Sequence, residues 1–164
     1  MISKAMQDAI NEQIKNEFYS AYMYLSMSAY FQANNLPGFA AWLRVQFQEE
    51  QTHALKLYDH MIDRGGRIDL KALSQPPAEW KTSLEAFQNV LTHEQHVTAL
   101  INQVYETALS EKDYPAQVLL QWFINEQVEE EKNATEIVEQ LKLIDSHGTA
   151  VLMLDHRLGK RGGE

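Results

Sequence analysis

Glutamates interrupt the apolar stripes of four long segments of this sequence, at positions where a core residue is expected. They are Glu17, Glu50, Glu94 and Glu130, and His53 follows Glu50 by about one helical turn. Four carboxylates buried together would repel one another and lose their hydration, so their pKa values would rise. Two divalent cations would balance the four charges. Oxygen ligands with one imidazole suit Fe, Mn or Zn, and the pattern therefore predicts a two-metal site.

The segments that must position these side chains are rich in strong helix formers and contain no alternating β-branched runs. Three of the breaks between these segments contain Pro37, the pair Gly65 and Gly66, and Pro115. A proline fits the first turn of a helix, and a glycine fits the left-handed position after its end. Ser83 and Glu85 contribute to the start of the third segment. We predict four long helices and a short fifth, over residues 5–33, 38–65, 82–112, 115–145 and 147–157.

The lengths of the connections predict how these helices are arranged. The first and second helices, and the third and fourth, are joined by only a few residues, so each pair must be antiparallel. Residues 66–81 are long enough to run the length of a bundle, which makes the second and third helices parallel. We therefore predict an all-α, antiparallel four-helix bundle with one long crossover, within a single domain of residues 1–164. Each of the four glutamates then falls near mid-height in its helix, and all four share one central layer.

Composition narrows the function classes. The chain has 164 residues, with 14 Lys and Arg against 23 Asp and Glu, a net charge of −9 and no cysteine. This balance disfavours nucleic acid and suits cations, and the lack of cysteine excludes disulfides, thiolate zinc sites and iron–sulfur clusters. The first eight residues lack an apolar signal core, and no stretch approaches 18 apolar residues. We expect a cytoplasmic protein with neither a nucleic-acid nor a membrane partner.

Motifs on all four long helices resemble the non-haem ferritins of bacteria. The matching segments are NEFYSAYMY at residues 16–24, NLPGF at 35–39, EEQTHA at 49–54, HE at 93–94 and FINEQVEEE at 123–131. The resemblance extends over essentially the whole chain. It implies a ferritin-like bundle that stores iron, and a ferroxidase that oxidises Fe²⁺ with O₂ or H₂O₂ and deposits hydrated ferric oxide inside a shell, expected to have 24 subunits.

The resemblance also implies roles for individual residues. Glu17, Glu50 and His53 would bind one iron, and Glu50 would bridge to a second iron that Glu94 and Glu130 complete. A glutamine beside the centre and a tyrosine just outside it match Gln127 and Tyr24. A third iron site matches four acids, of which the last is shared with the centre: Glu49, Glu126, Glu129 and Glu130.

Departures from neighbouring families sharpen this interpretation. Haem-containing bacterioferritins have a methionine ligand where this chain has Gln51 and Thr52, so no haem is expected. They also carry a second Glu-x-x-His motif where this chain has Gln127 and Glu130. Rubrerythrins need cysteines for a second iron site, and this chain has none.

Three other functions stay open at the level of sequence. A diiron enzyme could act on an organic substrate, although such enzymes are usually longer. The chain could be an inert helical interaction module whose mid-bundle acids are coincidental. A miniature DNA-protecting ferritin would place its iron ligands between subunits.

The C-terminal region is harder to interpret. Residues 150–154 (AVLML) are apolar all round, which a single bundle cannot cover. The fifth helix could fold back on the end of its own bundle, but the resemblance favours a helix that meets its symmetry mates around a fourfold axis of a 24-subunit shell. The tail of residues 160–164 is expected to be mobile.

Overall fold

The computed structural model describes residues 2–144 and 147–161, and this part of the chain folds into five α-helices with no strand. They are α1 Lys4–Ala33, α2 Pro37–Asp63, α3 Ser83–Ser110, α4 Tyr114–Ile144 and α5 Gly148–Leu158. Their order and lengths confirm the predicted all-α bundle, and the helix ends differ from the prediction by at most two residues among those described.

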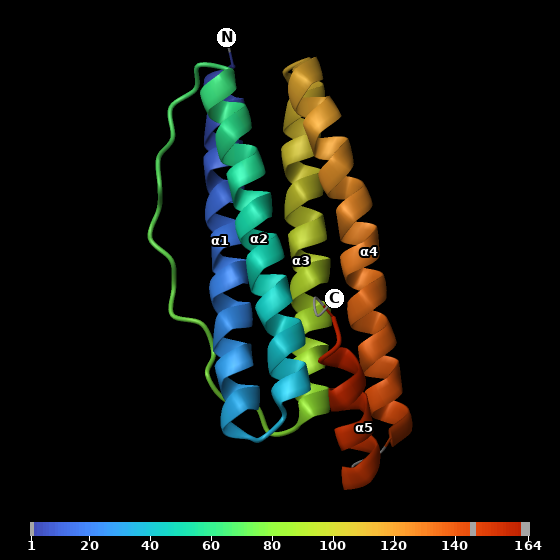
Figure 1. Ribbon diagram of the computed structural model, residues 1–164. Helices are drawn as coiled ribbons and strands as arrows, with labels where there is room; N and C mark the ends of the chain where they lie inside the picture. Colours follow the sequence, from blue (N-terminus) through green and yellow to red (C-terminus); the bar gives the residue numbers. More distant parts are fainter. Residues whose placement is uncertain (1, 145–146, 162–164) are drawn as a thin grey trace.

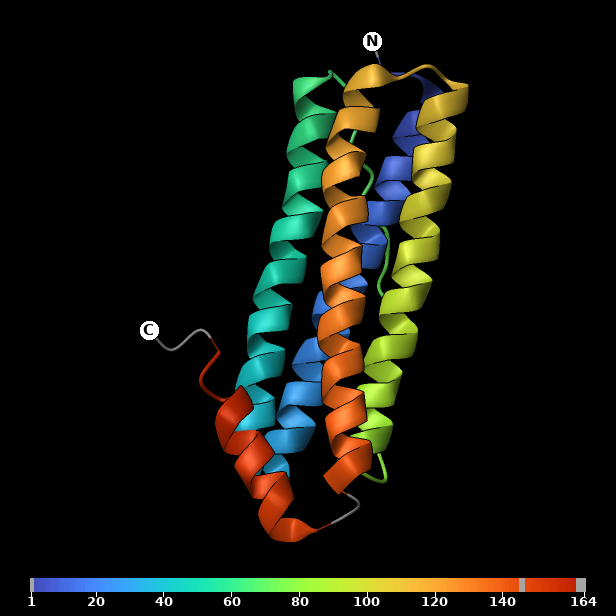
Figure 2. The same ribbon diagram turned by 90° about the vertical axis from the view of Figure 1, so that its right-hand side faces the viewer.

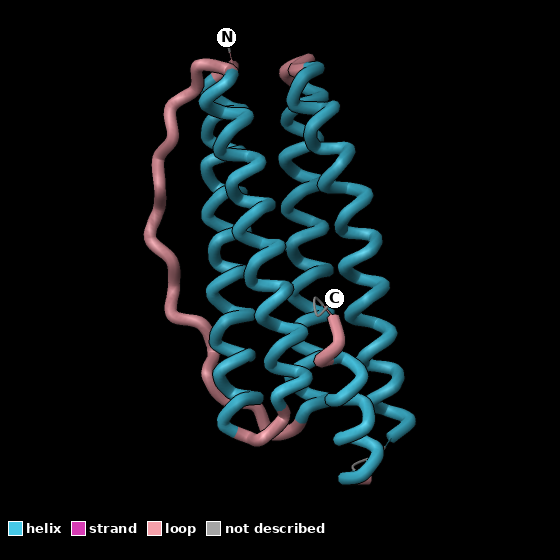
Figure 3. The backbone as a smooth tube through the Cα atoms, viewed as in Figure 1, coloured by secondary structure: helices cyan, strands magenta, loops and turns pink. Residues whose placement is uncertain are grey.

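The topology is the predicted one. α1 and α2 form one antiparallel hairpin, α3 and α4 form another, and α2 and α3 run in the same direction (Figures 1 and 2). Residues 64–82 have no helix and descend along the outside of the bundle beside α1, from the end of α2 to the start of α3 (Figures 1 and 3).

Local chemistry explains where the helices begin and end. Pro37 is the first residue of α2. The N-cap of α3 is Thr82, whose hydroxyl accepts a hydrogen bond from the backbone N–H of Glu85 at 3.0 Å. At the end of α2, Gly65 has a φ of 67°, and the backbone N–H groups of Gly65 and Gly66 bond to Ile62 and Met61, which satisfies carbonyls of the last turn.

The ends of α1 and α3 are built in the same way as the end of α2, but without glycine. Asn35 and Lys112 take the left-handed conformation, with φ of 59° and 53°. The following residues close the turn, because Leu36 N–H bonds to the carbonyl of Phe31 and Asp113 N–H bonds to that of Ala108. Asn tolerates this conformation, but Lys gives no signal for it, so the end of α3 at Ser110 was predicted two residues too late.

Two apolar clusters fill the bundle, one on each side of the glutamate layer. The aromatic cluster contains Phe31, Phe39 and Phe87 and lies at the end where α1 turns into α2, with ring centroids 5.1–5.7 Å apart. The aliphatic cluster contains residues such as Ile10 and Leu57 and lies at the opposite end. Burial of these side chains supplies the driving force for folding, and the polar layer between them is therefore held from both sides.

The register of α4 differs from the sequence expectation. The three- and four-residue spacing of Leu119, Phe123, Glu126 and Glu130 predicts one apolar stripe through all four. Leu119 and Glu126 are only half-buried, however, and Leu120 and Gln127 face the core instead. Val118 and Val128 are about 70% exposed, so apolar residues lie on both faces of this helix and its period is ambiguous from sequence.

The short helix α5 folds back along α2 (Figure 2). Asp155 Oδ1 accepts a hydrogen bond from the backbone N–H of Phe39 at 2.7 Å, and Leu154 packs into the aromatic cluster. The helix thus packs against its own bundle, while Leu152 and Met153 stay 58% and 69% exposed. Its contact with symmetry mates stays a prediction. Of the tail, Arg161 is held against α2, whereas residues 162–164 lie outside the described residues. None of the described helices is long and apolar enough to cross a membrane.

Candidate metal centre

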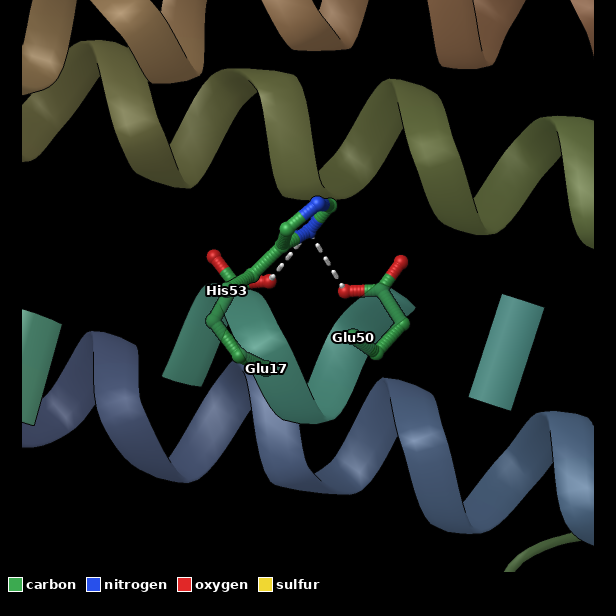
Figure 4. A group of neighbouring side chains, drawn as sticks. All are labelled: Glu17, Glu50 and His53. Carbon is green, nitrogen blue, oxygen red and sulfur yellow. Dashed lines mark hydrogen bonds and ion pairs between the residues drawn. The ribbon is translucent and has the colours of Figure 1, made fainter. Parts of the chain in front are cut away.

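Glu17 of α1 and Glu50 and His53 of α2 point toward one another (Figure 4). His53 Nδ1 lies 3.2 Å from Glu50 Oε2 and 4.0 Å from Glu17 Oε2, and all three side chains are buried. One ligand atom from each lies within 4.8 Å of the others. The spacing of three residues places Glu50 and His53 on one face of α2, opposite Glu17.

One carboxylate oxygen of this group has no hydrogen-bond partner. Gln13 Nε2 donates to Glu17 Oε1 at 2.8 Å, but Glu17 Oε2 is buried without a hydrogen bond. A buried carboxylate oxygen left in this state is costly. A cation among these three residues would satisfy it, so the donor set and the unpaired atom fit a metal ion.

Glu94 of α3 is anchored by neighbours on two other helices. The Tyr24 hydroxyl donates to Glu94 Oε1, and Gln127 Nε2 donates to Glu94 Oε2 at 3.0 Å. The same Gln127 amide lies 3.3 Å from Thr98 Oγ1. Tyr24 and Gln127 thus touch Glu94 directly and fix where its carboxylate points.

Glu130 of α4 completes the layer. Gln46 Nε2 donates to Glu130 Oε2 at 2.8 Å. The charges of Glu17, Glu94 and Glu130 all act on Glu50, so the four predicted core glutamates share one layer, each from a different long helix. Glu94 is not among the residues whose possible ligand atoms lie within 4.8 Å of one another.

Burial and mutual repulsion dominate the electrostatics of the layer. Burial, together with the charges of Glu94 and Glu17, raises the pKa of Glu50 well above its usual range. Burial also raises the pKa of Glu94 to about 7, although two hydrogen bonds oppose this, and the pKa of Glu130 to about 8. Burial and the charge of Glu94 raise the pKa of Tyr24. Metal-free, the layer retains protons near neutral pH, and a bound cation would have to release them.

A second group of possible ligands lies on the α4 side of His53. It contains His53, Glu126 and Glu130, and His53 Nε2 is 4.0 Å from Glu126 Oε1. Glu49, also expected at a third iron site, instead forms an ion pair with Arg161 at 2.7 Å. Glu129 is exposed and belongs to neither group. Of the four residues expected at the third iron site, the structure thus brings Glu126 and Glu130 together, but not Glu49 or Glu129.

Several residues around the centre were not anticipated from sequence. Gln13 and Gln46 each donate to a core glutamate, and Trp122 packs edge-on against His53 with ring centroids 5.4 Å apart. Gln46 had a signal, because it interrupts the apolar stripe of α2 as the glutamates do. Arg161 had none, because it comes from the far end of the chain.

Comparisons with known proteins agree with this geometry. Residues 7–144 match the ferritin-like domain family. The chain belongs to the ferritin family. A protein named bacterial non-heme ferritin from Bacteroides fragilis is 42% identical over 161 residues, which cover 98% of this chain and 100% of that relative. The relative of the same name from Campylobacter jejuni is 38% identical, over 94% and 93% of the two chains.

The similarity extends to solved structures of ferritins. An open-pore ferritin from the hyperthermophilic archaeon Archaeoglobus fulgidus superimposes with a TM-score of 0.96 at 48% identity, and the match covers 97% of this chain and 98% of that one.

Proposed function

We propose that this chain is an iron-storage ferritin whose bundle contains a ferroxidase centre. Glu17, Glu50 and His53 bind one Fe²⁺, and Glu50 bridges to a second Fe²⁺ that Glu94 and Glu130 bind. The observation that carries this proposal is the buried layer itself, in which one carboxylate oxygen of Glu17 lacks a hydrogen-bond partner. Such a layer is unfavourable without cations and is relieved by two of them.

The proposed reaction is the oxidation of Fe²⁺ by O₂, and its electrons and protons balance. Each Fe²⁺ gives up one electron, and O₂ takes two electrons and two protons to become H₂O₂, so two Fe³⁺ form for each O₂ reduced. Hard carboxylate ligands favour Fe³⁺ over Fe²⁺, which drives the oxidation. Gln127 and Tyr24 orient Glu94, and Tyr24 also places a redox-active ring beside the centre.

Storage requires a route from the centre to a cavity. Glu126, Glu129 and Glu49, with the shared Glu130, form a third iron site beside the centre. The oxidised iron leaves through it and accumulates as hydrated ferric oxide inside a homo-oligomeric shell of 24 copies. We further propose that the chain is a single domain of residues 1–164 that works in the cytoplasm without haem.

The alternatives are less well supported. The three-residue group of Glu17, Glu50 and His53 lies within one chain, unlike the intersubunit site of a miniature ferritin. A pocket of about 280 Å³ between α3 and α4 is lined in part by Gln127 and Thr98.

Anaerobic Fe²⁺ titration followed by air tests the proposal, with particle size measured by light scattering. We expect two to three Fe²⁺ per chain, rapid oxidation, and a dissolved shell that retains hundreds of ferric ions. Oxygen consumption without iron retention would indicate a diiron enzyme for another substrate. No stoichiometric binding would leave an inert helical module.

A further inference from the structure

The C-terminal segment, residues 159–161, places a cation against Glu49, one of the acids that were expected to bind the third iron. Arg161 lies beyond α5, and its guanidinium contacts three side chains on one face of α2. It stacks on the Trp42 ring at 4.6 Å, donates to Gln46 Oε1 at 2.5 Å and donates to Glu49 Oε2 at 2.7 Å. These positions are spaced by four and three residues, so the segment follows a single face of the helix.

The contact continues into the metal centre through one side chain. Gln46 accepts from Arg161 through Oε1 and donates to Glu130 through Nε2. A guanidinium can only donate, so Arg161 fixes the orientation of the amide and turns its nitrogen toward Glu130. Arg161 therefore forms a direct hydrogen bond to Glu49. Through Gln46 it is also connected to one oxygen of Glu130.

A metal ion at the third site would bind the same two carboxylates. Glu49 and Glu130 are two of its four expected ligands, and each has an oxygen engaged while Arg161 is in place. By contrast, no Lys or Arg side chain pairs with Glu17, Glu50 or His53 in the described residues. The two parts of the site thus differ in whether a protein cation already stands at the ligands.

We infer that Arg161 is a tethered cation at the third site, which an incoming metal ion must displace from Glu49 together with the C-terminal segment. Arg161 acts as a positioning residue. The two sites of the centre fill first, the second of them through the Glu130 oxygen that Gln46 does not engage. Release of Arg161 then frees Glu49 and lets Gln46 turn away from Glu130. This inference rests on the proposed iron sites.

The test uses assembled protein titrated with Zn²⁺, which does not undergo oxidation, and with anaerobic Fe²⁺. The variant Arg161→Gln removes the charge, and we expect the weakest of three binding steps to tighten by about tenfold, the scale of one lost charge-assisted hydrogen bond. Arg161→Lys keeps the charge without the planar fork and should fall between the two. The matched control is Arg157→Gln, because Arg157 bonds to Gln140 and not to Glu49. It should titrate as the native protein does.

A second readout follows the segment itself. The chain has no cysteine, so Lys160→Cys provides a unique attachment point for a nitroxide label next to Arg161. We expect the label to stay immobilised through the first two Zn²⁺ equivalents and to become mobile on the third. In Arg161→Gln it should be mobile from the start.

The outcomes separate this inference from the proposed function. Three binding steps that are the same in Arg161→Gln and the native protein, with a label that never moves, would overturn the role of Arg161 and leave the iron sites standing. Two steps in both proteins would overturn the third site and this inference with it. No binding in any variant would overturn the proposed function as well.

Discussion

Glu50 lies at the point where all the charges of the layer converge. Its pKa is raised by burial and by carboxylates from three other helices, Glu94, Glu17 and Glu130. No lysine or arginine bonds to it among the described residues, and His53 Nδ1 is its hydrogen-bonding neighbour. A carboxylate in this position is useful to a protein that binds cations there, and unfavourable to one that does not.

Replacing this side chain should therefore separate stability from activity. Glu50→Ala removes the proposed bridge, so we expect rapid Fe²⁺ oxidation to be lost while the assembled size is unchanged. Glu50→Gln keeps the volume and removes the charge, and its metal-free form should unfold at a higher temperature than the native protein because one source of repulsion is gone. Stopped-flow oxidation and thermal unfolding monitor the two effects.

Asp59→Asn is the matched control, because Asp59 is an exposed acid on the same helix and lies outside both ligand groups. It should leave both measurements unchanged. Oxidation at the native rate by Glu50→Ala would refute the bridge.

At the scale of the helices, the contact between α2 and α5 depends on the absence of a side chain. A Cβ on Gly38 would lie 1.7 Å from the backbone oxygen of Asp155, so the two helices can approach only if this residue is glycine. We expect Gly38→Ala to detach α5, to break the bond from Phe39 N–H to Asp155, and to cost about 1–3 kcal/mol. Hydrogen exchange should rise in residues 148–161 and not in the body of the bundle.

Gly148→Ala provides the comparison. A Cβ at Gly148 meets nothing within 4 Å, so this variant should keep α5 protected and be neutral or slightly stabilising. Equal exchange in the two variants would show that the close approach at Gly38 does not hold the helix.

Asp113 connects the two hairpins at the opposite end of the bundle. Its carboxylate accepts two hydrogen bonds from Arg64, just after α2, at 2.8 and 3.1 Å, and a third from the backbone N–H of Ala116 in the first turn of α4. Asp113→Ala should cost about 2–3 kcal/mol, because a partly buried Arg64 and a helix start lose their partner together. Urea unfolding measures this, and Asp63→Ala on the exposed end of α2 should have an effect below about 0.5 kcal/mol.

The helices and the core glutamates could be predicted from sequence because the spacing of apolar residues and the residues that end helices are local signals. The glutamates interrupt stripes that are otherwise apolar, and Pro37 and Gly65 mark helix ends by their backbone chemistry. The register of α4 was misjudged because Val118 and Val128 place apolar residues on its outer face. The contact of Arg161 with Glu49 joins residues 112 positions apart, and no spacing rule connects a short tail to one face of a distant helix.

At the scale of the whole molecule, the polar layer divides the hydrophobic core in two. The aromatic cluster and the aliphatic cluster lie on either side of it, and each is built from residues of all four long helices. Folding free energy gained from these clusters offsets the cost of assembling the carboxylates between them. The metal-free protein therefore stores an electrostatic strain that a bound cation relieves, and the pH dependence of stability should reveal it.

The sign of that dependence follows from the pKa values. A carboxyl whose pKa rises from 4.5 when unfolded to about 7 at Glu94, or about 8 at Glu130, retains its proton in the folded state, so the stability of the metal-free protein falls as pH rises through this range. Burial and the neighbouring charge of His96 act oppositely at His93, where they lower the pKa from 6.5 to about 4, so this residue adds stability as pH rises to 6.5. Above pH 6.5 the carboxyl effect stands alone.

Between pH 6.5 and 8 we therefore expect the urea midpoint of chelator-treated protein to decrease, because its free energy of unfolding falls by at most about 1.4 kcal/mol per pH unit for each retained proton. With saturating Zn²⁺ the trend should reverse, because binding displaces those protons and strengthens as they become easier to remove. Glu130→Gln should flatten the metal-free slope, whereas Glu139→Gln, on the exposed face of the same helix, should preserve it. A metal-free midpoint that is constant or rises over this window would mean that the layer is already relieved without a cation, and the case for a cation-binding core would lose its physical basis.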